Sequence, residues 1–132
     1  MLLPWKEHAP VPIIVQKYGG TSMGSVERIL AVADRVVAAR EAGNDVVVAV
    51  SAMGHTTDEL FEMARRITDL PDPRELDMLL TAGERIAMSM LGIALNARGC
   101  KAASYTGSQA GIITDTRHGA AKIIEIRPKR IL

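Results

Sequence analysis

Residues 17–22 (KYGGTS) place a lysine, two glycines and two hydroxyl side chains between an apolar run and an amphipathic stretch. Glycines let the backbone approach a ligand closely and point its N–H groups at an anion. A helix N-terminus beyond them adds partial positive charge, and a lysine ammonium suits a transferring phosphoryl group. The segment therefore predicts a phosphate site, although a sharp strand-to-helix turn with an exposed lysine is the alternative. It is neither a Walker loop nor a dinucleotide-binding fingerprint.

A second polar loop, residues 51–58, follows the apolar run at residues 46–50. In an open α/β sheet, ligands bind beyond the carboxyl ends of the strands. Ser51 and Thr57 would offer hydroxyl groups there. Thr56 stands three residues before Glu59, which is capping-box spacing, so helix capping explains Thr56 better than ligand binding does.

Residues 81–85 (TAGER) place a charged pair between apolar helical flanks. A buried charge needs a partner, so Glu84 could hold a cationic group of a substrate. The alternative is a surface pair formed by Glu84 and Arg85. The three histidines share no metal-ligand spacing, so no structural zinc site and no other metal site is expected.

Apolar periodicity predicts strands that alternate with helices. The expected strands are residues 11–16, 46–50, 101–106, 112–114 and a last one around 123–126. The expected helices run from a Ser25 N-cap to Gly43, over residues 57–68, and from an Asp72 N-cap to Gly99 with a break at Gly83. This order predicts an α/β fold with a mainly parallel sheet.

Composition excludes several classes of protein. The chain has 132 residues, 48% apolar and 23% charged, with a formal net charge of +1. This balance fits one globular domain and argues against a dedicated nucleic-acid binder, which needs a clustered basic surface. The single cysteine, Cys100, excludes an internal disulfide framework and fits a reducing cytoplasm.

No membrane segment or secretory signal is expected. The longest apolar stretch, residues 86–95, is well short of the roughly 20 residues that a spanning helix needs. Residues 1–10 contain no apolar run of signal-peptide length and are predicted to be a loose leader. Residues 11–132 then form the folded part.

Four blocks of the sequence, in order, resemble the aspartokinases of the amino-acid kinase family. They are residues 17–22 (KYGGTS), the block ending at Asp58 (VVVAVSAMGHTTD), residues 78–86 (MLLTAGERI) and residues 105–114 (YTGSQAGIIT). Each block alone is modest, but together they are highly specific and cover nearly the whole chain. The resemblance implies a three-layer sandwich in which helices cover a mainly parallel sheet, here incomplete.

The resemblance also implies a reaction: ATP and L-aspartate give 4-phospho-L-aspartate, the first step toward lysine, threonine and methionine. Lys17 would stabilise charge on the transferring γ-phosphoryl group. Gly19, Gly20 and Thr21 would lie against the ATP phosphates, and Mg²⁺ would be carried by the nucleotide.

On the substrate side, the resemblance implies that Ser51, Thr57 and Glu84 contact aspartate, with Glu84 near its amino group. His55 departs from the family pattern, which usually has an aspartate there. This exchange puts a titratable ring in place of an anion beside the substrate loop.

The chain stops at Leu132, before the nucleotide-binding segment and the regulatory ACT domains that the resemblance implies. Residues 11–132 are therefore expected to be the N-terminal part of the catalytic domain. This part is either a piece of a longer protein or a truncated relative, and it is expected to be inactive alone. A homo-oligomer or a complementary kinase chain would complete it. The alternative is a non-catalytic module that binds a partner or an anion.

Overall fold

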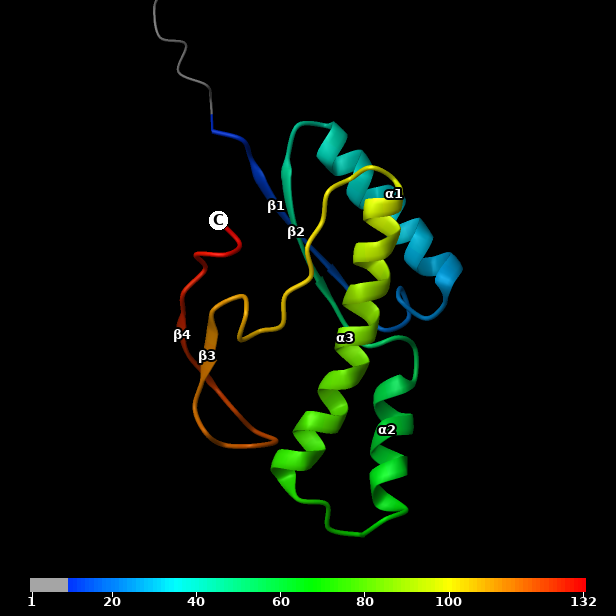
Figure 1. The fold of residues 1–132 in the computed structure, drawn as a ribbon, viewed down its shortest axis with the longest axis vertical. Coiled ribbons are helices and arrows are strands. Elements are labelled where there is room, and N and C mark those ends of the chain that lie inside the picture. Colours follow the sequence, from blue (N-terminus) through cyan, green and yellow to red (C-terminus); the bar gives the residue numbers. More distant parts are fainter. Residues whose placement is uncertain (1–9) are drawn as a thin grey trace, which may run out of the picture.

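The computed structural model describes residues 10–132 and contains three helices and two small sheets (Figure 1). The strands β1 (Ile13–Tyr18) and β2 (Asp45–Val50) pair in parallel. The helices are α1 (Val26–Glu41), α2 (Thr56–Arg65) and α3 (Pro73–Ala97). The strands β3 (Ile112–Thr114) and β4 (Ile123–Ile126) form a separate antiparallel pair. The predicted leader lies outside the described residues except for Pro10.

The β1–β2 sheet is covered on one face only. α1 and α3 pack against each other and against β2, and α2 packs along the first half of α3 (Figure 1). Tyr18 and Val48 lie on the covered face, against the hydrophobic core. Ile13 and Val15, on the opposite face, are 53% and 70% exposed. The predicted class is confirmed as an incomplete α/β domain, and the described residues provide one helical layer over the parallel sheet.

The hydrophobic core lies between α1 and α3. Its small residues, such as Ala33, Ala87 and Ala94, let the two helices approach closely while larger side chains fill the layer. The buried core residues are Met23, Ile29, Val32, Ala33, Val36, Ala87, Leu91, Ala94 and Leu95.

Two of the predicted helix starts are confirmed. The Ser25 hydroxyl accepts a hydrogen bond from the Arg28 amide at 3.3 Å. The Asp72 carboxylate accepts one from the Glu75 amide at 3.1 Å, with Pro73 in the first turn. Both bonds satisfy amides that a helix leaves unpaired at its N-terminus.

The predicted capping box at α2 is wrong. Thr56 lies inside the helix, and His55 is the N-cap without a side-chain capping bond. The Thr56 amide donates to the Met53 carbonyl at 2.9 Å, so a backbone turn already closes ahead of the predicted cap. The helix therefore begins one residue earlier than predicted.

The predicted break at Gly83 is also wrong. α3 is 25 residues long and continues through Gly83 without interruption. A Cβ atom on Gly83 would lie 3.0 Å from the Ala52 Cβ. The glycine therefore permits close approach between α3 and the loop after β2. α3 is the one helix among residues 10–132 with the length and apolar composition of a membrane span. Its contacts with α1 and α2 identify it as a core helix.

Residues 101–106 do not form the predicted strand. They follow α3 as an irregular segment, in which Ala102 exchanges backbone hydrogen bonds with the Asn96 side chain at 3.1 Å. The Ser104 hydroxyl donates to the Met88 carbonyl at 3.0 Å. These contacts hold the segment on α3, so it makes no ladder with β2. The two short strands predicted beyond it are confirmed as β3 and β4.

Candidate active site

Two loops meet at the carboxyl edge of the parallel sheet. Residues 19–24 follow β1, and residues 51–55 follow β2. The Ser51 amide donates to the Tyr18 carbonyl, and the Gly54 amide donates to the Gly20 carbonyl, both at 3.0 Å. A Cβ atom on Gly20 would lie 3.1 Å from two carbonyl oxygens of the second loop, so glycine is required there. The two loops therefore form one unit.

The first loop presents a row of amide groups. The Met23 amide donates to the Gly19 and Gly20 carbonyls, at 3.2 and 3.1 Å. In contrast, the amides of Gly20, Thr21 and Ser22 donate to no acceptor within the described part of the chain. Successive backbone N–H groups of this kind form a concave site for an anion.

The start of α1 has the electrostatics that favour an anion. The pKa of Glu27, in the first turn, is lowered by the backbone N–H there and by the Ser25 hydroxyl. Helix N-termini carry partial positive charge, which stabilises a carboxylate or a phosphate. The loop of residues 19–24 leads directly into this helix end.

Lys17 lies one residue before the end of β1, opposite Ala49 in the parallel register. Its side chain is exposed and on the uncovered face of the sheet. Among residues 10–132 it forms no ion pair. The ammonium is thus available to an anion that approaches this edge of the sheet.

The middle of α3 meets the second loop at Gly83. A Cβ atom there would lie 3.4 Å from the Thr56 side chain, next to Thr57 in the first turn of α2. Glu84 follows directly and is exposed rather than buried, contrary to expectation. It forms no ion pair with Arg85 in the described structure, so the surface-pair alternative is not observed.

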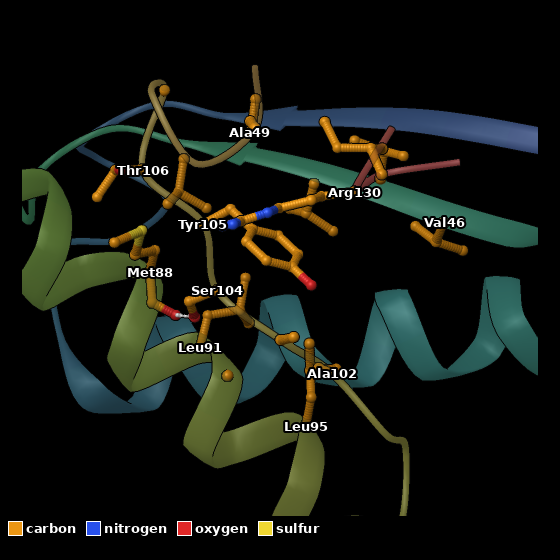
Figure 2. Close-up of a pocket in the computed structure, with 18 of the residues that line it drawn as sticks. Val46, Ala49, Met88, Leu91, Leu95, Ala102, Ser104, Tyr105, Thr106 and Arg130 are labelled. Carbon is orange, nitrogen blue, oxygen red and sulfur yellow. Dashed lines mark hydrogen bonds between the residues drawn. The ribbon is translucent and has the colours of Figure 1, made fainter. Parts of the chain in front are cut away.

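A cavity of about 1100 Å³ opens between β2, α3 and residues 100–108 (Figure 2). Tyr105 and Arg130 project into it (Figure 2), and Thr106 and Ser108 are among the residues that line it. Of the predicted site residues, Glu84 alone lines this cavity. Gly19, Gly20, Thr21 and Ser51 lie in the two loops at the sheet edge instead. Lys17 lies near the end of β1 and Thr57 in the first turn of α2, next to these loops.

Sequence reasoning missed Arg28. This residue lies on the exposed surface of α1, where a charged side chain is ordinary, yet its Nη1 atom donates to the Thr21 carbonyl at 2.5 Å. No motif or spacing marks it. The contact arises because the loop folds back over the first turn of the helix.

A second polar cluster lies away from the two loops. The imidazole Nδ1 of His118 lies 3.2 Å from an Asp77 oxygen, and the Gly119 amide donates to the same carboxylate at 2.9 Å. These bonds attach the turn between β3 and β4 to the beginning of α3. In that turn, the Arg117 guanidinium lowers the pKa of Asp115.

The model of the amino acid kinase family matches residues 12–131 of the sequence. This chain belongs to the amino acid kinase family. The family resemblance seen in the four sequence blocks is thereby confirmed.

The similar proteins are aspartokinases. The aspartokinase of Mycolicibacterium smegmatis is 56% identical over 119 residues, which cover 90% of this chain and 28% of that protein. The enzyme of Corynebacterium glutamicum is 55% identical over the same shares. The crystal structure of aspartate kinase from Synechocystis superposes with a TM-score of 0.74 at 48% identity, covering 78% of this chain and 18% of that one. The chain thus spans about 28% of the length of the curated relatives it matches.

Proposed function

We propose that this chain forms part of an aspartate kinase, which transfers the γ-phosphoryl group of ATP to the side-chain carboxylate of L-aspartate. The observation that carries the proposal is the loop of residues 19–24 beside Lys17, in a chain 56% identical to an aspartokinase. Three amides of this loop have no acceptor among residues 10–132. The product, 4-phospho-L-aspartate, would supply lysine, threonine and methionine synthesis in the cytoplasm.

The first loop would bind the nucleotide. The amides of Gly20 and Thr21 would donate to phosphate oxygens, and Gly19 would let the backbone approach them. Lys17 would neutralise charge that develops on the γ-phosphoryl group. Mg²⁺ would arrive on the nucleotide, bound mainly by its phosphates.

The second loop and α3 would bind aspartate. The hydroxyls of Ser51 and Thr57 would donate to its carboxylates, and the exposed Glu84 carboxylate would accept from its ammonium group. The side-chain carboxylate then attacks phosphorus, a new P–O bond forms, and ADP leaves with the electrons of the broken bond. The nucleophile is already ionised, so catalysis needs positioning and charge stabilisation rather than a general base.

A second function is favoured by the uncovered face of the sheet, where Val15 is 70% exposed. The chain would then be a module that binds another kinase chain or an anion without turnover. A homo-oligomer or a complementary kinase chain would cover this face in either case.

A chimera tests the proposal. The matched 119 residues of the Mycolicibacterium smegmatis aspartokinase are replaced by those of this chain, and aspartate-dependent ADP release is measured. Turnover supports the kinase function, whereas a folded chimera that binds nucleotide without turnover favours the binding module.

Lys17→Ala in this chimera should lower kcat by about 10²–10³, the usual effect of removing one preorganised donor. The melting temperature should barely change, because Lys17 makes no ion pair within the described residues. Lys122→Ala, at another exposed lysine, is the matched control. Parallel losses of stability and activity would indicate a structural lysine.

Glu84→Gln tests the aspartate side of the site. It should raise KM for aspartate and leave KM for ATP nearly unchanged, with Glu41→Gln on α1 as the control. The opposite pattern would assign Glu84 to the nucleotide.

A further inference from the structure

We propose that Arg28 is a positioning residue, which orients the Ser22 amide toward the phosphates of the nucleotide. The inference rests on the proposed function. It adds a residue on the outer surface of α1 to a site otherwise built from the two loops and α3.

The Thr21 carbonyl accepts two hydrogen bonds, one from the Arg28 side chain and one from the Gly24 amide at 3.3 Å. Arg28 Nη1 donates to the Thr21 carbonyl at 2.5 Å, and the Arg28 amide donates to Ser25 at 3.3 Å. The side chain therefore reaches back from a capped helix turn to the loop. A guanidinium donor makes a stronger hydrogen bond than a neutral one.

The Thr21 carbonyl and the Ser22 amide belong to one planar peptide unit, and no peptide bond in the described chain is cis. In a trans peptide the C=O and N–H groups point in opposite directions. A guanidinium that holds the carbonyl on the α1 side therefore directs the Ser22 N–H away from α1.

The preceding peptide is held in the same way by another group. The Gly54 amide donates to the Gly20 carbonyl at 3.0 Å, which fixes the direction of the Thr21 N–H. Within the loop, the Met23 amide also donates to the Gly20 carbonyl and the Gly24 amide to the Thr21 carbonyl, at 3.1 and 3.3 Å. From outside the loop, Gly54 holds the first of these peptides and Arg28 holds the second with the shorter, charged hydrogen bond.

Arg35 provides a matched control. Arg28 and Arg35 line the same small cleft of about 220 Å³ beside Thr21. Arg35 makes no hydrogen bond to the loop within the described residues. Both arginines would add the same charge near a phosphate, but of the two only Arg28 donates to the Thr21 carbonyl.

The kinetic test uses the chimera described above. Arg28→Ala should raise KM for ATP on the order of tenfold, in line with the loss of one charged hydrogen bond. KM for aspartate should stay within about twofold, and Arg28→Lys, which keeps a charged donor, should recover part of the loss. Arg35→Ala should leave both constants near their original values. An equal effect of Arg35→Ala, or an unchanged KM for ATP in Arg28→Ala, would overturn the inference.

A binding test separates this inference from the proposed function. Calorimetry measures the binding of inorganic tripolyphosphate to the 132-residue chain and to its Arg28→Ala, Arg28→Gln and Arg35→Ala variants. Weaker binding in the two Arg28 variants alone supports the positioning role, even if the chimera shows no turnover. Equal binding by all the variants contradicts the role even if the chimera is an active kinase.

Discussion

Residues 13–97 and residues 101–132 differ in where their apolar side chains lie. In the first region, α1 and α3 bury their apolar faces against each other, and every residue of the core cluster comes from it. In the second region, Ile123, Ile124 and Ile126 are 59%, 67% and 58% exposed. Both regions contain apolar side chains, but only the first buries them in the core cluster.

The difference reflects how helices and strands form the hydrogen bonds of their backbone N–H and C=O groups. A helix closes its own hydrogen bonds, so two helices and a strand pair can form a buried layer from one continuous stretch of chain. A strand needs neighbouring strands, and a short two-stranded ribbon is marginal without further packing. The first region therefore builds a core by itself, whereas the second leaves the isoleucines of β4 in solvent.

The largest expected effect is on the free energy of unfolding, after a substitution in the packed region. Leu91→Ala should lower the free energy of unfolding by about 2–5 kcal/mol, because it leaves a cavity in the core. Ile124→Ala in β4 should cost less than about 0.5 kcal/mol, since that side chain is already exposed. Urea denaturation measures both. A comparable loss in Ile124→Ala would show that β4 packs as tightly as α3.

Gly83→Ala should cost about 1–3 kcal/mol, because its methyl group would lie 3.0 Å from the Ala52 Cβ. The control is Gly92→Ala, whose methyl group would meet only the Ser104 hydroxyl, at 2.9 Å. That hydroxyl lies at the end of a rotatable side chain, so it can move at the cost of its hydrogen bond to the Met88 carbonyl, whereas the Ala52 Cβ moves only with its backbone. Thermal melting should rank Gly83→Ala as the more destabilising change, and the reverse order would contradict the close approach of α3 to the second loop.

The uncovered sheet face should drive self-association of the isolated chain. Static light scattering should show a mass above the 14.2 kDa of the monomer, rising with concentration. Val15→Lys should shift the chain toward the monomer, because it places a charge on this face. Ala38→Lys, at an exposed position on α1, should have no such effect. A monodisperse monomer at all concentrations would contradict the prediction.

The smallest effect concerns the turn beyond β3. The Arg117 guanidinium and the Lys122 amide lower the pKa of Asp115 below its ordinary 3.8. A lowered folded-state pKa means that the stabilisation is complete above the unfolded pKa and is lost as pH falls through the folded one. Carboxyl NMR titration should show the low pKa, and Arg117→Ala should raise it. An unchanged pKa in that variant would assign the shift to the backbone amide alone.

Much of the fold and of the candidate site could be predicted from local sequence. The apolar periodicity that marks α1 and α3, and the caps at Ser25 and Asp72, depend on residues a few positions apart. The KYGGTS loop is equally local, because glycine geometry and helix electrostatics act within one turn. The roles of Lys17, Thr57 and Glu84 remain predictions.

Only the tertiary structure decided the contacts between distant segments. From the sequence, Gly83 is predicted to break the helix. In the structure it lies against the Ala52 side chain inside a continuous helix. Residues 101–106 have strand composition, but Ala102 and Ser104 form their hydrogen bonds with Asn96 and Met88 of α3. Arg28 looks like an ordinary surface charge until the loop folds back and Thr21 accepts its hydrogen bond. In each case the deciding energy comes from a close approach or hydrogen bond that periodicity and spacing along the chain do not encode.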